Sequence, residues 1–178
     1  MRRPARWRLR RARGFQKREL YALFGNKEAM LVACITERAQ RLKAPTDLRA
    51  ARQRNFWPKV LTAFGTRLLT ETTDPVVVAV FRLAISETVH APKVAQALDS
   101  IARKPTRDAL RAIMANAKSA GLVRWRSRRD DRKILGLLWG DLMTGLLLQA
   151  ADRPSAAEIA RRARDTTTAL LQIYPEPG

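Results

Sequence analysis

The chain has 178 residues, with 35 Lys or Arg against 16 Asp or Glu, so its formal net charge is +19. This length suits one domain with a core, or a small head on a larger body, and the charge favours a polyanionic partner. The single cysteine, Cys34, excludes an intrachain disulfide and a cysteine-based zinc site, and it suits a reducing cytoplasm.

Residues 1–16 contain seven arginines and no acid. Pro4 and the repulsion between these charges disfavour a packed element, so we expect a disordered basic arm. The positive charges are not followed by an apolar run long enough for a signal peptide, and export is therefore not expected. Residues 1–54 hold 16 basic and 4 acidic residues, which makes this third of the chain the main candidate for binding a polyanion.

Residues 17–44 predict a short basic helix over 17–24, a tight turn and a second helix from 27 to about 43. Gly25 can end the first helix in a left-handed conformation, and Asn26 can cap the second with its side-chain oxygen. The second helix has an apolar stripe in which Cys34 is expected to be buried, with a redox role as the alternative. The first helix has the size and charge to enter a DNA major groove.

The pattern Leu-Tyr-x-x-Phe-x-x-Lys-Glu-x-Leu carries a family resemblance. It is filled by Leu20, Tyr21, Phe24, Lys27, Glu28 and Leu31. It resembles the third and fourth helices of the TetR (tetracycline repressor) family of bacterial regulators. The resemblance implies that the first helix reads DNA, that Tyr21 and Lys27 contact phosphates, and that Lys17 and Arg18 face bases or the backbone.

The chain departs from the family pattern upstream of this motif. Gly14-Phe15-Gln16 stands where the family has Gly-Val-Ser, and Glu19 stands where it favours Thr. Residues 1–13 also lack the apolar periodicity of the two helices that support the family's recognition helix. A late start codon or a shifted reading frame upstream of about Lys17 would explain the difference. We therefore expect an N-terminally incomplete helix-turn-helix.

Residues 45–178 predict a helical body. Asn55 is expected to cap a helix over 56–70, and Asp74-Pro75 to start another that reaches about residue 90. A strand is the alternative for the valine-rich run 76–81, but the apolar spacing after it favours a helix. Pro92 and Pro105 are expected to open two further helices, the second ending at Ala120-Gly121. A charged connection follows over 124–132.

Residues 133–150 are apolar nearly all round a helix, which predicts one central helix packed on both sides. The segment is short for a membrane span and contains Asp141, so no span is expected. Ser155 and Glu158 form a capping-box pattern for a last helix over 155–173. The predicted fold class is all-α.

The body resembles the ligand-binding and dimerisation region of the same family. This resemblance implies that the last two helices pair with their counterparts in a second subunit as a four-helix bundle. Their apolar surface agrees with an interface, and Gly136 and Gly140 would allow close approach. Burial within one chain is the alternative. The expected interface residues are Leu142, Met143, Leu146, Leu147, Ile159, Ala163, Thr167 and Leu170.

A pocket for a small apolar effector is expected among the middle helices. Ordinary packing is the alternative for each residue that could line it. The expected lining residues are Trp57, Phe64, Phe81, His90, Met114 and Trp139. His90 is the sole histidine, which argues against a histidine metal site and a Ser-His-Asp triad. We therefore expect no enzyme activity, metal or cofactor.

The leading hypothesis is a cytoplasmic, dimeric TetR-type regulator that represses transcription by binding double-stranded operator DNA and is released by its effector. The alternative is a ligand-binding dimerisation remnant without sequence-specific DNA binding. A third hypothesis, attraction of the basic arm to anionic membrane, rests on charge alone.

Overall fold

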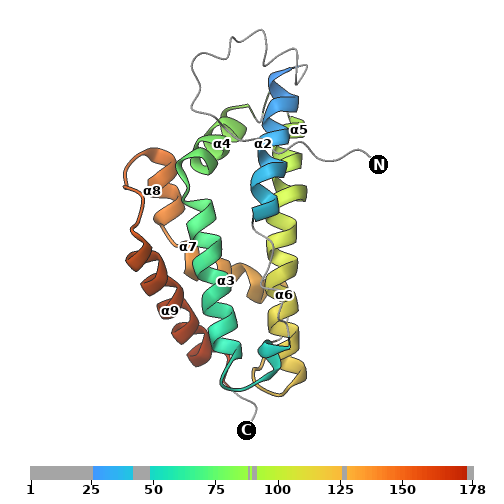
Figure 1. Cartoon of the computed structure of the whole chain (residues 1–178), viewed down its shortest axis with the longest axis vertical. Helices are drawn as coiled ribbons and strands as arrows, with labels where there is room; N and C mark the ends of the chain where they lie inside the picture. The colour runs from blue at the N-terminus through green and yellow to red at the C-terminus, as the bar shows by residue number, and fades with distance from the viewer. Residues whose placement is uncertain (1–25, 42–48, 88, 90–91, 126–127, 176–178) are drawn as a thin grey trace.

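The computed structural model describes residues 26–41, 49–87, 89, 92–125 and 128–175. All regular structure in these residues is helical, as the sequence predicts, and the helices lie in a bundle (Figure 1). None of the described helices is long and apolar enough to cross a membrane. The arm over 1–16 and the first predicted helix over 17–24 lie outside the described residues.

Helix α2 spans Lys27–Arg41, and the short 3-10 turn η1 spans Ala50–Arg52. The predicted cap of α2 is confirmed, because the Asn26 side-chain oxygen accepts from the backbone N–H of Ala29 at 2.8 Å. Leu31 and Ile35 form the buried stripe of α2. Cys34 is exposed instead of buried, because it lies on the flank of this stripe.

Helix α3, Trp57–Thr72, packs mainly against α9 and also contacts α4, α6 and α7 (Figure 1). Asn55 does not cap it: the helix begins one residue later than predicted, Phe56 occupies the cap position, and no side-chain capping bond forms. Gly65 allows a close approach, since a Cβ there would lie 3.2 Å from Leu138 Cδ1 and 3.4 Å from Ala163 Cβ.

Helix α4, Pro75–Ser86, is a helix and not a strand. Asp74 Oδ1 accepts from the backbone N–H groups of Val76 at 2.9 Å and Val77 at 3.4 Å, which confirms the predicted start. The helix ends at Ser86, earlier than the predicted end near residue 90. The backbone N–H of the next residue, Glu87, closes the last turn on the carbonyl of Leu83.

Helices α5, Pro92–Ala97, and α6, Lys104–Ser119, are joined by η2, a π-helical segment over Leu98–Arg103. Helix α6 begins at Lys104 with Pro105 in its first turn, as predicted, but η2 joins it to α5 without a break, so one rod runs from 92 to 119. Proline has no N–H and its ring crowds the carbonyl four residues earlier, so a widened turn before Pro105 relieves both problems. Gly121 ends the rod with a φ of +74°, as predicted.

The predicted single helix over 133–150 is broken into α7, Arg128–Trp139, and α8, Leu142–Leu148. Gly140, with a φ of +46°, turns the chain between them. Leu137 and Leu148 are exposed, so this apolar segment is not buried all round. Helix α9, Ala156–Ile173, begins with the predicted capping box of Ser155 and Glu158.

The described residues form two apolar clusters of unequal size. The larger lies between α3, α6, α7 and α9 and includes Leu68, Leu110 and Leu138. The smaller contains Leu31, Ile35, Ala84 and Val94, where α2 packs against α4 and α5. The two clusters place α2 on one side of the body and α9 on the other.

Candidate functional site

A cavity of about 580 Å³, including its open mouth, lies between the two apolar clusters. Most of this space is open to solvent: the enclosed part is about 50 Å³, below the roughly 300–1,000 Å³ of small-molecule sites, so a larger guest would also occupy the open mouth. Helices α2, α3, α4, α6 and α7 and the π-helical segment η2 all contribute to its wall. The lining residues are Cys34, Ile35, Arg38, Ala39, Leu68, Glu71, Thr72, Val77, Val80, Phe81, Leu98, Ala102, Arg103, Thr106 and Trp139.

The hydroxyl groups in the wall donate to their own helices. Thr72 Oγ1 donates to the carbonyl of Leu68 at 2.7 Å, and Thr106 Oγ1 donates to that of Ala102 at 2.8 Å. Donors already engaged in this way present mainly methyl groups to a ligand. The wall therefore suits an apolar guest.

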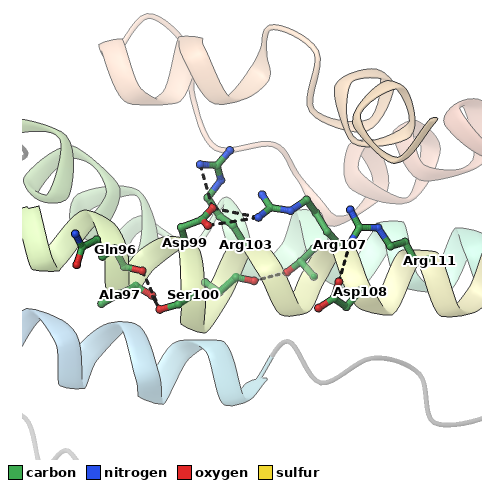
Figure 2. A network of polar contacts seen from close by, with 10 residues as sticks. Gln96, Ala97, Asp99, Ser100, Arg103, Arg107, Asp108 and Arg111 are labelled. Carbon is green, nitrogen blue, oxygen red and sulfur yellow. Dashed lines mark hydrogen bonds and ion pairs between the residues drawn. The ribbon is translucent and has the colours of Figure 1, made fainter. Parts of the chain in front are cut away.

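The two arginines of the wall are held by carboxylates outside it. Arg38 Nη2 of α2 lies 3.5 Å from Asp74 Oδ1, at the cap of α4. Arg103 Nη1 lies 3.5 Å from Asp99 Oδ1, and Arg107 Nη2 approaches the same oxygen at 3.2 Å (Figure 2). These contacts fix the arginines without burying them fully, so their electrostatic contribution to stability is modest.

Trp139, which lines the cavity, carries a buried polar group without a described partner. Its indole Nε1 is buried and has no hydrogen-bond partner among the described residues. A buried donor without an acceptor costs free energy. The Trp139 backbone carbonyl accepts from Arg162 Nη2 at 2.8 Å, which fixes the end of α7 beside the cavity.

Only some of the residues predicted to line the effector pocket lie around the cavity. Phe81 and Trp139 line the cavity. Trp57, Phe64 and Met114 do not, because they are buried in the larger cluster at 2%, 5% and 0% exposure. His90 lies outside the described residues.

Sequence reasoning missed the four wall residues on α2, which are Cys34, Ile35, Arg38 and Ala39. The spacing of these residues along one helix is visible in the sequence. That spacing, however, predicts this helix only as part of the DNA-binding region over 17–44. No group of three or more potential metal ligands occurs among the described residues.

The predicted DNA contacts remain predictions. Lys17, Arg18 and Tyr21 lie outside the described residues. Lys27 is the first residue of α2, as expected, but its side chain is also outside the description.

The predicted interface residues differ in burial. Leu142, Met143 and Leu147 are half-buried, whereas five others already belong to the core of one chain: Leu146, Ile159, Ala163, Thr167 and Leu170. The four on α9 are buried because they share the face of that helix that packs against α3. The exposed apolar residues of α7 and α9 are instead Leu137, Leu171 and Ile173. A Cβ on Gly136 would meet nothing within 4 Å, so the backbone of α7 is open to a neighbour there.

Comparison with known proteins agrees with this architecture. Residues 59–176 match the family model of the AefR-like transcriptional repressor C-terminal domain. No curated protein sequence matches the chain significantly.

Two solved structures have the same fold. A protein described as a TetR-family transcriptional regulator from Mesorhizobium loti superimposes with a TM-score of 0.75 at 19% identity, over 89% of this chain and 80% of that one. A TetR transcriptional regulator from Agrobacterium tumefaciens gives a TM-score of 0.75 at 24% identity, over 89% and 78%. With the family match over residues 59–176, these likenesses establish that the chain belongs to the TetR family of transcriptional regulators.

Proposed function

We propose that this regulator acts in the cytoplasm as a dimeric repressor, which binds operator DNA through residues 17–44 and leaves it when a small apolar effector binds in the cavity between α2 and residues 45–178. The observation that carries this proposal is the position of α2. This helix directly follows the predicted DNA-reading segment and also provides part of the cavity wall, through Cys34, Ile35, Arg38 and Ala39.

Effector binding and DNA binding are coupled through α2. A ligand in the cavity contacts α2 on one side and α3, α4 and η2 on the others, so it favours one placement of α2 on the body. If operator DNA favours another placement, each ligand weakens the binding of the other by the same factor. The Arg38–Asp74 ion pair between α2 and the start of α4 is the polar contact that such a shift would strain.

The effector is an apolar molecule with one acceptor oxygen. The hydroxyls in the wall are engaged within their helices, and the Trp139 indole N–H is without a partner in the described residues. Two probes of the same shape test this assignment: 2-acetylnaphthalene, which has a ketone oxygen, and 2-isopropenylnaphthalene, which lacks it. We expect the ketone to bind about fivefold more tightly, the value of one hydrogen bond of about 1 kcal/mol.

Trp139→Phe should remove that preference while the apolar probe still binds. Ala102→Phe should fill part of the cavity and weaken both probes. Equal affinity of the two probes for the wild-type protein would contradict the assigned acceptor, and unchanged binding to Ala102→Phe would contradict the assigned cavity.

The dimer forms through the outer faces of α7 and α9. Leu137, Leu171 and Ile173 are exposed apolar side chains on these helices, and Gly136 leaves the α7 backbone open. Exposed apolar groups of this kind mark an interface. The half-buried Leu142, Met143 and Leu147 extend it along the same segment. Sedimentation velocity should show a dimer that Gly136→Leu and Leu171→Arg weaken, and a monomeric wild-type protein at micromolar concentration would refute it.

Selection from a random duplex library at about 150 mM salt tests operator recognition. Only a folded DNA-reading segment should bind its selected sequence about a thousandfold or more tightly than random duplex. Tyr21→Phe and Lys27→Gln remove predicted phosphate contacts and should weaken binding to all sequences similarly. Lys93→Gln, at an exposed position of α5, is the matched charge control.

The alternative function is a ligand-binding dimer without sequence-specific DNA binding. The absence of the family's Gly-Val-Ser entry to the recognition helix favours it, since Gly14-Phe15-Gln16 stands there. It predicts intact probe binding and dimerisation, together with equal affinity for selected and random duplexes.

A further inference from the structure

The described residues carry a concentrated positive charge at the end of the bundle away from α4. There α3 begins, and α6 and α9 end (Figure 1). Four exposed cations lie in these segments: Arg52 of η1, Lys59 in the first turn of α3, Lys118 in the last turn of α6, and Arg124 just after it. We call these four residues the basic end.

Specific contacts join these segments into one surface. Arg52 Nε donates to Asn116 Oδ1 of α6 at 3.0 Å, which ties η1 to the end of α6. The backbone N–H of Arg124 donates to the carbonyl of Pro175 at 3.2 Å, which ties the loop after α6 to the chain after α9. Lys59 extends over the exposed ring of Phe56, with Nζ 5.2 Å from the ring centroid. The four cations therefore share one end of the molecule and not merely one stretch of sequence.

The charge of the basic end has no described acid to balance it. Residues 49–60, 115–125 and 170–175 contain no Asp or Glu, while Glu176 lies outside the described residues. The same segments contain Arg49 and Arg54, which make interactions of their own.

The cavity side of the molecule is different in this respect. Arg38 pairs with Asp74, and Arg103 and Arg107 share Asp99 (Figure 2). Cations spread over a protein surface normally alternate with acids in this way. A cluster of like charges repels itself and concentrates counterions, and a polyanion that displaces those counterions is bound.

We propose that the basic end binds the phosphate backbone of duplex nucleic acid, at a site separate from the N-terminal segment. Its four donors come from four places at one end of the bundle, and contacts of cations with phosphates carry no sequence readout. The site does not depend on operator recognition. One molecule could hold a second duplex segment at this end while its N-terminal segment binds the first.

Lysine footprinting on the full-length protein tests the site directly. The protein is acetylated briefly with an N-hydroxysuccinimide ester, with and without a random 20-base-pair duplex, and the extent at each lysine is measured by mass spectrometry. We expect Lys59 and Lys118 to be protected at least threefold, while the exposed lysines Lys93 and Lys104 react equally in both samples. Lys17 and Lys27 report on the N-terminal segment in the same experiment, so failure there is distinguishable from failure at the basic end.

A second measurement counts the phosphates that the basic end contacts. Replacing Arg52, Lys59, Lys118 and Arg124 with Gln should reduce the magnitude of the slope of log affinity against log salt by about 3.6, because each of the four phosphate contacts adds roughly 0.9. The matched control replaces four exposed cations elsewhere, Lys93, Lys104, Arg132 and Arg153, and should change the slope by less than about 1.

Equal acetylation of Lys59 and Lys118 with and without duplex would overturn the proposal, as would equal slope changes in the two variants. Stronger protection by vesicles that contain phosphatidylserine than by the duplex would also overturn it, since the partner would then be a membrane surface.

Discussion

Arg162 of α9 donates from Nε to the carbonyl oxygen of Leu138 at 2.6 Å, at the point where α7 ends. Its Nη2 donates to the next carbonyl, that of Trp139, at 2.8 Å. The last carbonyls of a helix have no partner within it, and a cation beside them is also favoured by the helix dipole. Arg162 therefore stabilises the break at Gly140 and holds Trp139 in the cavity wall.

Replacing Arg162 with Gln should lower the free energy of unfolding by about 2–3 kcal/mol, because a charged donor to two carbonyls is lost. Arg161→Ala, the exposed neighbour on the same helix, should stay within about 0.5 kcal/mol of the wild type. Urea denaturation at one fixed protein concentration measures both. If the two variants lose the same stability, Arg162 is not the group that holds the break.

The caps show what local sequence can predict. Asp74 and Ser155 act within three residues of their own positions, so their patterns alone located the starts of α4 and α9. The break in 133–150 was not predictable in this way. The partner that satisfies its freed carbonyls, Arg162, lies more than 20 residues away in the sequence, and the apolar run conceals the turn at Gly140.

The cavity was predictable only in part for a similar reason. Aromatic side chains can be found in the sequence, but whether one lines a cavity or fills the core depends on how helices pack. Phe81 lines the cavity and Phe64 lies in the core, although both occur in amphipathic helices. The wall from α2 arises because α2 packs against α4, α5 and η2, a tertiary fact that helical spacing does not contain.

Gly65 and Gly136 should respond oppositely to added side chains. Gly65→Val places methyl groups against Leu138 and Ala163, and overpacking of this kind costs about 1–3 kcal/mol. Gly136→Ala meets nothing within the chain and should gain about 0.5–1 kcal/mol in the monomer from higher helix propensity. Thermal unfolding at a concentration below dimer formation compares them. Equal destabilisation would mean that α3 does not approach α7 and α9 closely at Gly65.

The buried carboxylate of Asp131 should be important for stability. Asp131 is 0% exposed and accepts from Arg111 Nε, which also binds Asp108 through Nη1 at 2.8 Å. The hydrogen bond with Asp131 is the main cause that raises the pKa of Arg111. The Arg111 side chain that remains is 30% exposed and still paired with Asp108, so Asp131→Asn should cost about 1.5–3 kcal/mol, the value of a hydrogen bond to a charged group.

Asp108→Asn removes only the exposed partner of Arg111 and should cost less than about 1 kcal/mol. Chemical denaturation of the two variants at neutral pH provides the comparison. A cost for Asp108→Asn that equals or exceeds that for Asp131→Asn would show that burial does not decide the strength of this network.

The capping box of α9 should stabilise the protein at neutral pH and lose this effect in acid. Ser155 Oγ donates to Glu158 Oε2 at 2.7 Å, and the backbone N–H of Ser155 donates to the same oxygen at 2.7 Å. These bonds, the side-chain one first, lower the pKa of Glu158 from its ordinary value of 4.5. The ionised carboxylate therefore stabilises the folded state above the ordinary pKa, and this contribution is lost as the pH falls through the lowered pKa.

Glu158→Gln should accordingly be less stable than the wild type at pH 6–7, and the difference should shrink as the pH falls below about 4.5. Ser155→Ala removes the main cause of the shift but keeps the backbone bond, so its stability should depend on pH less than that of the wild type and more than that of Glu158→Gln. It should also lose stability at every pH, because the Glu158 N–H loses its acceptor. Thermal unfolding between pH 3 and 7 measures all three proteins. A stability difference between the wild type and Glu158→Gln that grows in acid would have the wrong sign for a lowered pKa.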